Sequence, residues 1–221
     1  MSSMYNELLL GLTETSYPLE DILLKLKVLA HKLKNKQLAD FVNSELNGYE
    51  NEVPSYRIFE GHLTGTVENF ACRRTKVTLP YLHLKEHGLE NLGQCFFTEK
   101  VSTLIEYAKL NDIHKPIPPE LYSILSEPLG NGYVVTKAYV PINTAFIAGI
   151  LSSIRTKLLD LILAMENELN ETEMENLFKN PTKEQKDKIN PLIDKFIQNN
   201  FNFNSFDNST QNAKIALETG K

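Results

Sequence analysis

Three polar side chains in the first third of the 221-residue chain could carry out acid–base chemistry on a phosphate ester. His31 could act as the general base, Glu45 as the acid and Arg57 as the clamp that holds a phosphate group. Such a site requires that the three side chains converge within hydrogen-bond reach of one pocket. The more common role of a histidine at the position of His31 is a satisfied core residue or a charge at a helix end.

Glu45 and Arg155 are charged residues on apolar helix faces. Glu45 follows Phe41 by four positions, and Arg155 follows Leu151 by four positions in a long aliphatic stretch. An unpaired charge in such a place is costly, so Glu45 must find a donor or stay near water, and Arg155 is expected to pair with an acid or with backbone carbonyl groups. We hypothesise that Arg155 pairs with Glu45 or a neighbouring carboxylate, and we favour a structural tie between helices over a catalytic pair.

Aromatic residues follow Glu45 closely. Tyr49, Tyr56 and Arg57 lie just after an Asn-Gly pair that should end the helix. They could line a concave binding surface where the helices meet the first strand. Anchoring of a loop by aromatic packing is the more ordinary alternative. Together with Arg155, these residues are our candidates for a binding site.

The segment His83–His87 matches the H-x-x-E-H pattern of inverted zinc peptidases. Pro80 and Gly88 leave barely two helical turns for it, and no acid-bearing partner motif follows. We therefore interpret these histidines as surface residues and predict no metal site. The sequence contains no P-loop, dinucleotide fingerprint or nucleophile elbow, and we predict no cofactor.

The composition is that of an ordinary globular protein, with 42% hydrophobic residues and a net charge of −5. This charge argues against nucleic-acid binding through bulk electrostatics, although the basic run Arg73–Lys76 could touch phosphate locally. Cys72 and Cys95 form no disulfide framework, and no apolar stretch has the length of a membrane span. We expect a cytoplasmic protein with reduced thiols and no membrane contact.

Hydrophobic periodicity predicts the elements that would position the candidate residues. A short apolar helix near Leu8–Leu12 precedes a helix over 19–34 and a second helix that ends at Asn47–Gly48. The short link between the two long helices predicts an antiparallel hairpin. The segment 56–67 predicts one strand, with a bulge or bend at its two glycines.

The rest of the chain predicts a small sheet and a long helix. In order, we expect a strand over 73–79, a helix over 101–110, a proline-stiffened connector over 114–120, a short helix over 121–125, a strand over 133–140 and a long helix over 143–170. Short helices should begin at Asn180-Pro181 and Asn190-Pro191, and the tail from Asn199 should be mobile. The predicted class is α+β, with an N-terminal helical hairpin and a long C-terminal helix packed with a small, mostly antiparallel sheet. Residues 1–170 form the predicted α+β domain, and residues 171–221 a helical extension and Asn-rich tail.

Several short motifs together resemble the opening of the AbiTii domain of bacterial abortive-infection proteins. The most specific are Glu-Leu-Asn-Gly-Tyr at 45–49 and Pro-Ser-Tyr-Arg at 54–57, preceded by a lysine-rich helix with a central Ala30-His31. The Pro-rich segment 117–119, Gly132-Tyr133 and the aliphatic helix around Arg155 agree with the same family. The resemblance covers about residues 5–170 and leaves the C-terminal region unexplained.

The resemblance implies defence against phage, in which an infected cell halts or dies before the phage matures. It also implies a partner protein encoded nearby, but no settled biochemical activity. We expect an interaction or oligomerising component of a defence complex, acting with that partner or as a homo-oligomer. The alternative is a toxin with nuclease activity that uses His31, Glu45 and Arg57.

Overall fold

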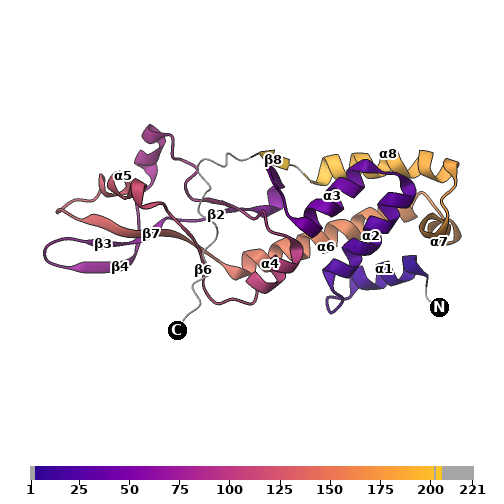
Figure 1. The fold of residues 1–221 in the computed structure, drawn as a ribbon, viewed down its shortest axis with the longest axis horizontal. Helices are drawn as coiled ribbons and strands as arrows, with labels where there is room; N and C mark the ends of the chain where they lie inside the picture. The colour runs from indigo at the N-terminus through magenta and orange to yellow at the C-terminus, as the bar shows by residue number, and fades with distance from the viewer. Residues whose placement is uncertain (1–2, 202, 206–221) are drawn as a thin grey trace.

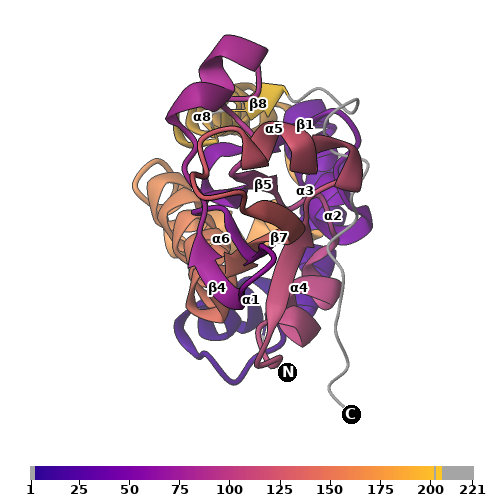
Figure 2. The ribbon, with the colours of Figure 1, turned by 90° about the vertical axis from the view of Figure 1, so that its left-hand side faces the viewer.

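The structure is a computed structural model that describes residues 3–201 and 203–205. A bundle of helices occupies one end of an elongated molecule, and a four-stranded sheet projects from the other end (Figure 1). Seen from the sheet end, the strands stand in front of the helices, with α5 beside β7 (Figure 2). The predicted α+β class with small antiparallel sheets and long C-terminal helices is confirmed.

The chain begins with three helices, α1 (Met4–Thr13), α2 (Leu19–Leu33) and α3 (Lys36–Asn47). Lys34 adopts a left-handed conformation, and the Asn35 side chain then accepts a hydrogen bond from the first turn of α3. This tight link folds α3 back on α2, and the two helices pack along their apolar stripes. The predicted helical hairpin is confirmed.

The predicted single strand over 56–67 is wrong. The chain instead forms β1 (Glu52–Pro54), a 3-10 turn (Ser55–Arg57), β2 (Ile58–Glu60) and β3 (Thr64–Glu68). The turn carries Arg57 into the interior, where it meets the C-terminal end of α3, and a continuous strand could not make that contact. The predicted irregularity at the glycines is present, because the register of β3 shifts just after Gly65.

The remaining strands complete three antiparallel sheets. They are β4 (Arg73–Thr78), β5 (Gln94–Phe96), β6 (Ile113–Pro116), β7 (Val134–Ile142) and β8 (Phe203–Ser205). The largest sheet has the order β4-β3-β7-β6, while β2 pairs with β5 and β1 with β8. Part of the predicted connector is therefore a strand, and Pro116 is tolerated there because β6 lies at a sheet edge.

Short helical segments connect the strands. They are the 3-10 turns Leu82–His87 and Pro119–Leu121 and the helices α4 (Val101–Tyr107) and α5 (Tyr122–Ser126). The α4 helix and the short helix near Leu121 match the predicted segments. α4 packs against α6 and lies at the junction between the bundle and the sheet (Figure 1).

The bundle is built around α6 (Thr144–Glu166), with Asn143 as its N-cap as predicted. α6 contacts α1, α4, α7 (Glu171–Lys179) and α8 (Lys183–Asn200). The predicted helix start at Pro191 is wrong, because this proline lies inside α8. Asn190 does not cap a helix there; its side-chain amide donates to the Leu33 carbonyl oxygen at 3.2 Å.

One hydrophobic core contains side chains of both α1 and α8. Its buried side chains come from α1, α2 and α3, from the sheet, and from α6, α7 and α8. The boundary after residue 170 stays a prediction, although α7 and α8 contribute to that same core. Most of the predicted mobile tail lies outside the described residues.

Candidate functional site

A buried carboxylate organises the region that the sequence motifs mark. Glu45, in the last turn of α3, is fully buried. Its Oε1 accepts hydrogen bonds from the hydroxyl groups of Tyr49 and Tyr56, both at 2.6 Å, and from Nε of Arg57 at 3.3 Å. Its Oε2 accepts from Nη2 of Arg57. Four donors therefore use both oxygens of this carboxylate.

Arg57 is as deeply buried as Glu45 and uses the rest of its guanidinium group on the main chain. Its Nη1 donates to the carbonyl oxygens of Phe97 and Glu99, each at 2.8 Å, and its guanidinium carbon lies 4.8 Å from the centre of the Tyr49 ring. Burial alone would lower the pKa of Arg57, but the charge of Glu45 raises it. Arg57 thus ties α3 to the segment between β5 and α4.

The predicted pair of Glu45 with Arg155 is wrong. Arg155 donates to the carbonyl oxygens of Gly11, Glu14 at 3.0 Å and Tyr17 at 2.6 Å, which lie at the end of α1 and in the link to α2. Helix-end carbonyls lack partners within their own helix and so accept readily from a guanidinium group. Arg155 therefore fixes the α1–α2 connection, and Arg57 takes the place at Glu45.

Burial and the neighbouring carboxylate keep both tyrosines protonated. The pKa of Tyr49 and the pKa of Tyr56 are raised well above the ordinary value of 10.0, first by desolvation and then by the charge of Glu45. With Arg57 positive and Glu45 negative, the four side chains form a charge-neutral cluster. We call Glu45, Tyr49, Tyr56 and Arg57 the buried clamp.

The structure does not bring His31 to the buried clamp. His31 is exposed in the last turn of α2, whereas Glu45 and Arg57 have no exposed surface. The three residues that a nuclease site would need therefore do not open onto one pocket. Among the sequence candidates, the fold gathers Glu45, Tyr49, Tyr56 and Arg57 and leaves His31 and Arg155 elsewhere.

An open groove of about 590 Å³ lies against the buried clamp, between α3, α8 and the β1–β8 pair. Its apolar lining includes Phe41, Phe201 and Phe203, and its polar lining includes Asp40 and Glu52. We call it the aromatic groove. Phe41 and Phe201 are almost fully buried and their ring centres are 4.2 Å apart, while Phe203 is 42% exposed.

The tyrosines of the clamp hold these rings in place. The Tyr56 ring meets Phe201 edge-on at 6.0 Å, and the Tyr49 ring lies 6.4 Å from Phe203. The hydroxyl groups of both tyrosines are fixed by Glu45. Sequence reasoning missed this groove because Phe201 and Phe203 follow a helix in an Asn-rich segment. Their alternating spacing was the one available signal.

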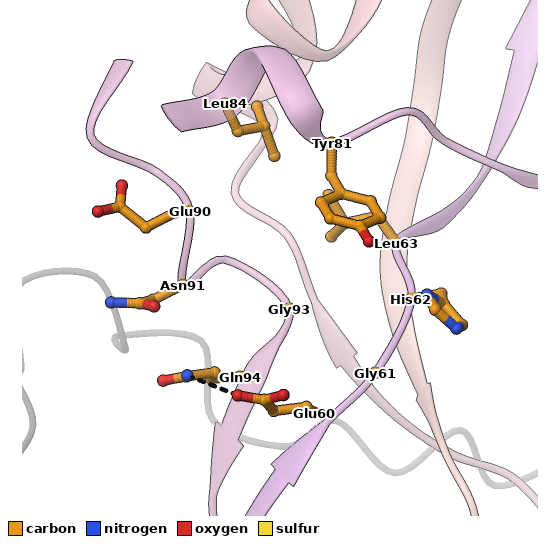
Figure 3. A pocket seen from close by; sticks show the side chains of 10 residues that line it. All are labelled: Glu60, Gly61, His62, Leu63, Tyr81, Leu84, Glu90, Asn91, Gly93 and Gln94. Atoms are coloured by element: carbon orange, nitrogen blue, oxygen red, sulfur yellow. Dashed lines mark hydrogen bonds between the residues drawn. The ribbon is translucent and has the colours of Figure 1, made fainter. Parts of the chain in front are cut away.

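A second, smaller pocket of about 280 Å³ lies beside the sheet (Figure 3). Leu63, Leu84 and Tyr81 line one part of it, and the Glu60 carboxylate on its rim already accepts from the Gln94 side chain at 3.0 Å. No residue of the buried clamp lines either hollow, but Tyr49 and Tyr56 contact the phenylalanine rings of the aromatic groove. The aromatic groove is thus the hollow that the clamp tyrosines support.

The histidines and acids of residues 3–201 and 203–205 do not form a metal centre. No group of three or more His, Cys, Asp or Glu side chains in this range is placed to hold a metal ion. His83 contacts the Ile124 carbonyl oxygen at 3.0 Å, and His87 contacts Glu127 at 3.2 Å. Within the same range, no helix is both long and apolar enough to cross a membrane.

Comparison with known proteins identifies the family. The model of the AbiTii family matches residues 3–191, which extends past α7 into α8. No curated protein and no solved structure matches the chain significantly. The family match covers well over half of the 221 residues and includes every residue of the buried clamp. The chain therefore belongs to the AbiTii family, and this membership implies a role in abortive-infection defence against phage.

Proposed function

We propose that this protein is a non-enzymatic interaction component of an abortive-infection system and binds a partner protein in the aromatic groove. The observation that carries the proposal is the contact between the clamp tyrosines and the groove phenylalanines. Arg57 holds the Glu45 carboxylate, and this carboxylate accepts from both tyrosine hydroxyls. The tyrosine rings in turn contact Phe201 and Phe203. The motif residues thus preorganise a surface.

The chemistry of the groove selects the kind of partner. Asp40 and Glu52 are exposed carboxylates beside the aromatic rings of Phe41, Phe201 and Phe203. A carboxylate next to an aromatic face suits a lysine or arginine side chain, through ion pairing and cation–π attraction. The partner segment we propose therefore presents a basic residue together with an apolar anchor.

The buried clamp supports a structural role over an acid–base role. Both oxygens of Glu45 are occupied, and Arg57 satisfies two main-chain carbonyl groups besides the carboxylate. A group that transfers protons needs access to a substrate, which two fully buried and mutually bonded side chains do not have. The clamp would act by holding the groove in shape.

The proposal is tested by co-purifying this chain with the protein whose gene lies next to its own. Phe203→Ala and Asp40→Lys change exposed groove positions, while Leu163→Ala and Asp160→Lys on α6 are matched controls for exposed apolar area and charge. We expect the amount of co-purified partner protein to be at least about tenfold lower for each groove variant than for its control. The circular dichroism spectra of all variants should be unchanged.

Two results would overturn it. Either the groove variants retain as much partner as the controls, or the wild-type protein retains none. Light scattering on the same samples measures self-association and so tests whether a second copy of this chain occupies the groove. Self-association that disappears only in the groove variants would place a second copy of this chain in the groove and reject a separate partner protein.

A further inference from the structure

The turn that joins β3 to β4 is a rigid projection at the end of the sheet farthest from the helices (Figure 1). The Asn69 side chain accepts hydrogen bonds from the backbone N–H groups of Ala71 at 3.0 Å and Cys72 at 2.9 Å. Its amide donates to the carbonyl oxygen of Asn131 in a neighbouring turn at 3.2 Å. The tip between these residues presents Phe70, whose side chain is 100% exposed.

The strand after this tip is strongly basic. Arg73, Arg74 and Lys76 are all exposed on β4, and no acidic residue occurs between positions 69 and 84. Arg73 contacts Glu68 at 3.0 Å, and because the Arg73 side chain is 67% exposed and the Glu68 side chain 36% exposed, solvent weakens this pair. A chain with a net charge of −5 thus concentrates three cations on one edge strand.

β4 is poorly suited to receive an added strand. Lys76 has a left-handed conformation with a φ of 55°, and the register between β3 and β4 shifts at the same place. Such a bulge interrupts the row of backbone groups that a docking strand would need, and charged residues on an edge strand oppose strand pairing. Binding at this edge therefore has to use the side chains.

Those side chains combine charge with planar surfaces. The guanidinium carbon of Arg74 lies 5.3 Å from the centre of the Tyr133 ring, which makes a stacked platform beside the strand. Phe70 adds a free aromatic face at the tip. Cations that follow a strand and aromatic faces that take bases are what single-stranded nucleic acid requires, whereas an acidic polypeptide has no use for the aromatic faces.

We propose that the β3–β4 hairpin is a binding site for single-stranded nucleic acid. Arg73, Arg74 and Lys76 contact the phosphates, and Phe70 stacks on a base. This site goes beyond the proposed partner binding, because it uses the sheet end of the molecule and shares no residue with the aromatic groove.

Fluorescence anisotropy with a labelled 12-nucleotide RNA of mixed sequence tests the site. The full chain with Arg73→Ala, Arg74→Ala and Lys76→Ala is compared with a matched variant that loses three exposed lysines elsewhere, Lys27→Ala, Lys36→Ala and Lys183→Ala. The hairpin variant should bind more than about tenfold more weakly than the matched variant at low salt. Its salt slope should fall by about 0.7 for each phosphate that the protein no longer neutralises.

A labelled poly-glutamate peptide separates nucleic acid from an acidic protein partner. Phe70→Ala should weaken RNA binding about tenfold and leave poly-glutamate binding unchanged, because only bases stack on the ring. The proposal is overturned if the wild type shows no saturable RNA binding at low salt, or if the hairpin and matched variants bind RNA equally. It is also overturned if poly-glutamate binds more tightly than RNA. Circular dichroism of every variant accompanies the titrations.

Discussion

Glu45 and Arg57 form an ion pair in which neither side chain has any exposed surface, and they stand only twelve positions apart in the chain. The pair joins the end of α3 to the 3-10 turn that precedes β2. It gives Glu45, Tyr49, Tyr56 and Arg57 of this chain a structural role without requiring that any of them react.

Removing one partner of this pair should be strongly destabilising. Arg57→Met leaves the Glu45 carboxylate buried without its cation, and the free energy of unfolding should fall by about 3–5 kcal/mol. Urea denaturation followed by circular dichroism measures the loss. The double variant Glu45→Met, Arg57→Met should be less destabilised than the sum of the two single variants. A loss of under about 1 kcal/mol for Arg57→Met would show that the pair does not stabilise the fold.

Because of the clamp tyrosines, the stability of the protein should fall as the pH becomes alkaline. The folded-state pKa of Tyr56 is raised above the unfolded value, so its contribution is fully present below about pH 10 and is lost as the pH rises further. Melting temperatures between pH 8 and pH 11 should therefore fall on the alkaline side. Tyr56→Phe should lower stability at pH 8 by roughly 1.5–3 kcal/mol, because a hydrogen bond to a carboxylate is lost.

The slope of melting temperature against pH shows whether Tyr56 causes the alkaline decline. Tyr56→Phe should show a shallower alkaline decline than the wild type, whereas Tyr81→Phe, at a half-exposed tyrosine away from the clamp, should keep the wild-type slope. Equal slopes for all three proteins would assign the decline to other groups.

Glu99 should destabilise the protein at neutral pH. Its Oε2 is buried without a hydrogen-bond partner, and desolvation raises the pKa of this carboxyl group. A raised folded-state pKa means that its contribution is most favourable below about pH 4 and declines as the pH rises through the folded value. Glu99→Gln should therefore raise the melting temperature at pH 7 and change it little at pH 4. The exposed Glu90→Gln is the control, and equal effects of the two substitutions at pH 7 would contradict this.

Arg155 should stabilise the connection between α1 and α2. Arg155→Ala removes the donor for the carbonyl oxygens of Gly11, Glu14 and Tyr17. Stability should fall by roughly 1–3 kcal/mol, and amide hydrogen exchange should quicken in residues 11–17 more than elsewhere. Arg155→Lys keeps one donor group, so its stability should lie between that of the wild type and that of Arg155→Ala. Unchanged exchange in this segment would show that the connection does not depend on Arg155.

The sequence predicted the elements whose pattern is local. The helical hairpin and the start of α6 at Asn143 follow from hydrophobic periodicity and capping residues within a few positions. The strand over 56–67 failed because Arg57 turns inward to reach Glu45, a tertiary contact that outweighs the β propensity of its neighbours. The predicted helix start at Pro191 assumed that a proline cannot lie inside a helix, but α8 continues through this residue.

For a similar reason, only part of the candidate site could be predicted from the sequence. The buried charge of Glu45 required a cation, but the chain offered both Arg57 and Arg155, and periodicity favoured the wrong one. The actual partners of Arg155 are main-chain carbonyl groups, which leave no signature in the sequence. The aromatic groove depends on β8 returning to pair with β1 across about 150 positions, a contact that single-sequence patterns do not carry.

The role of the aromatic groove is tested most directly by a phage challenge of cells that express the protein with either Phe203→Ala or Leu163→Ala. Both side chains are 42% exposed, so the two substitutions remove similar apolar surface from the aromatic groove and from α6. We expect that Phe203→Ala abolishes protection in a plaque assay while Leu163→Ala retains it, at equal protein level and with unchanged circular dichroism. Full protection by Phe203→Ala, or equal loss with both substitutions, would contradict the role of the groove.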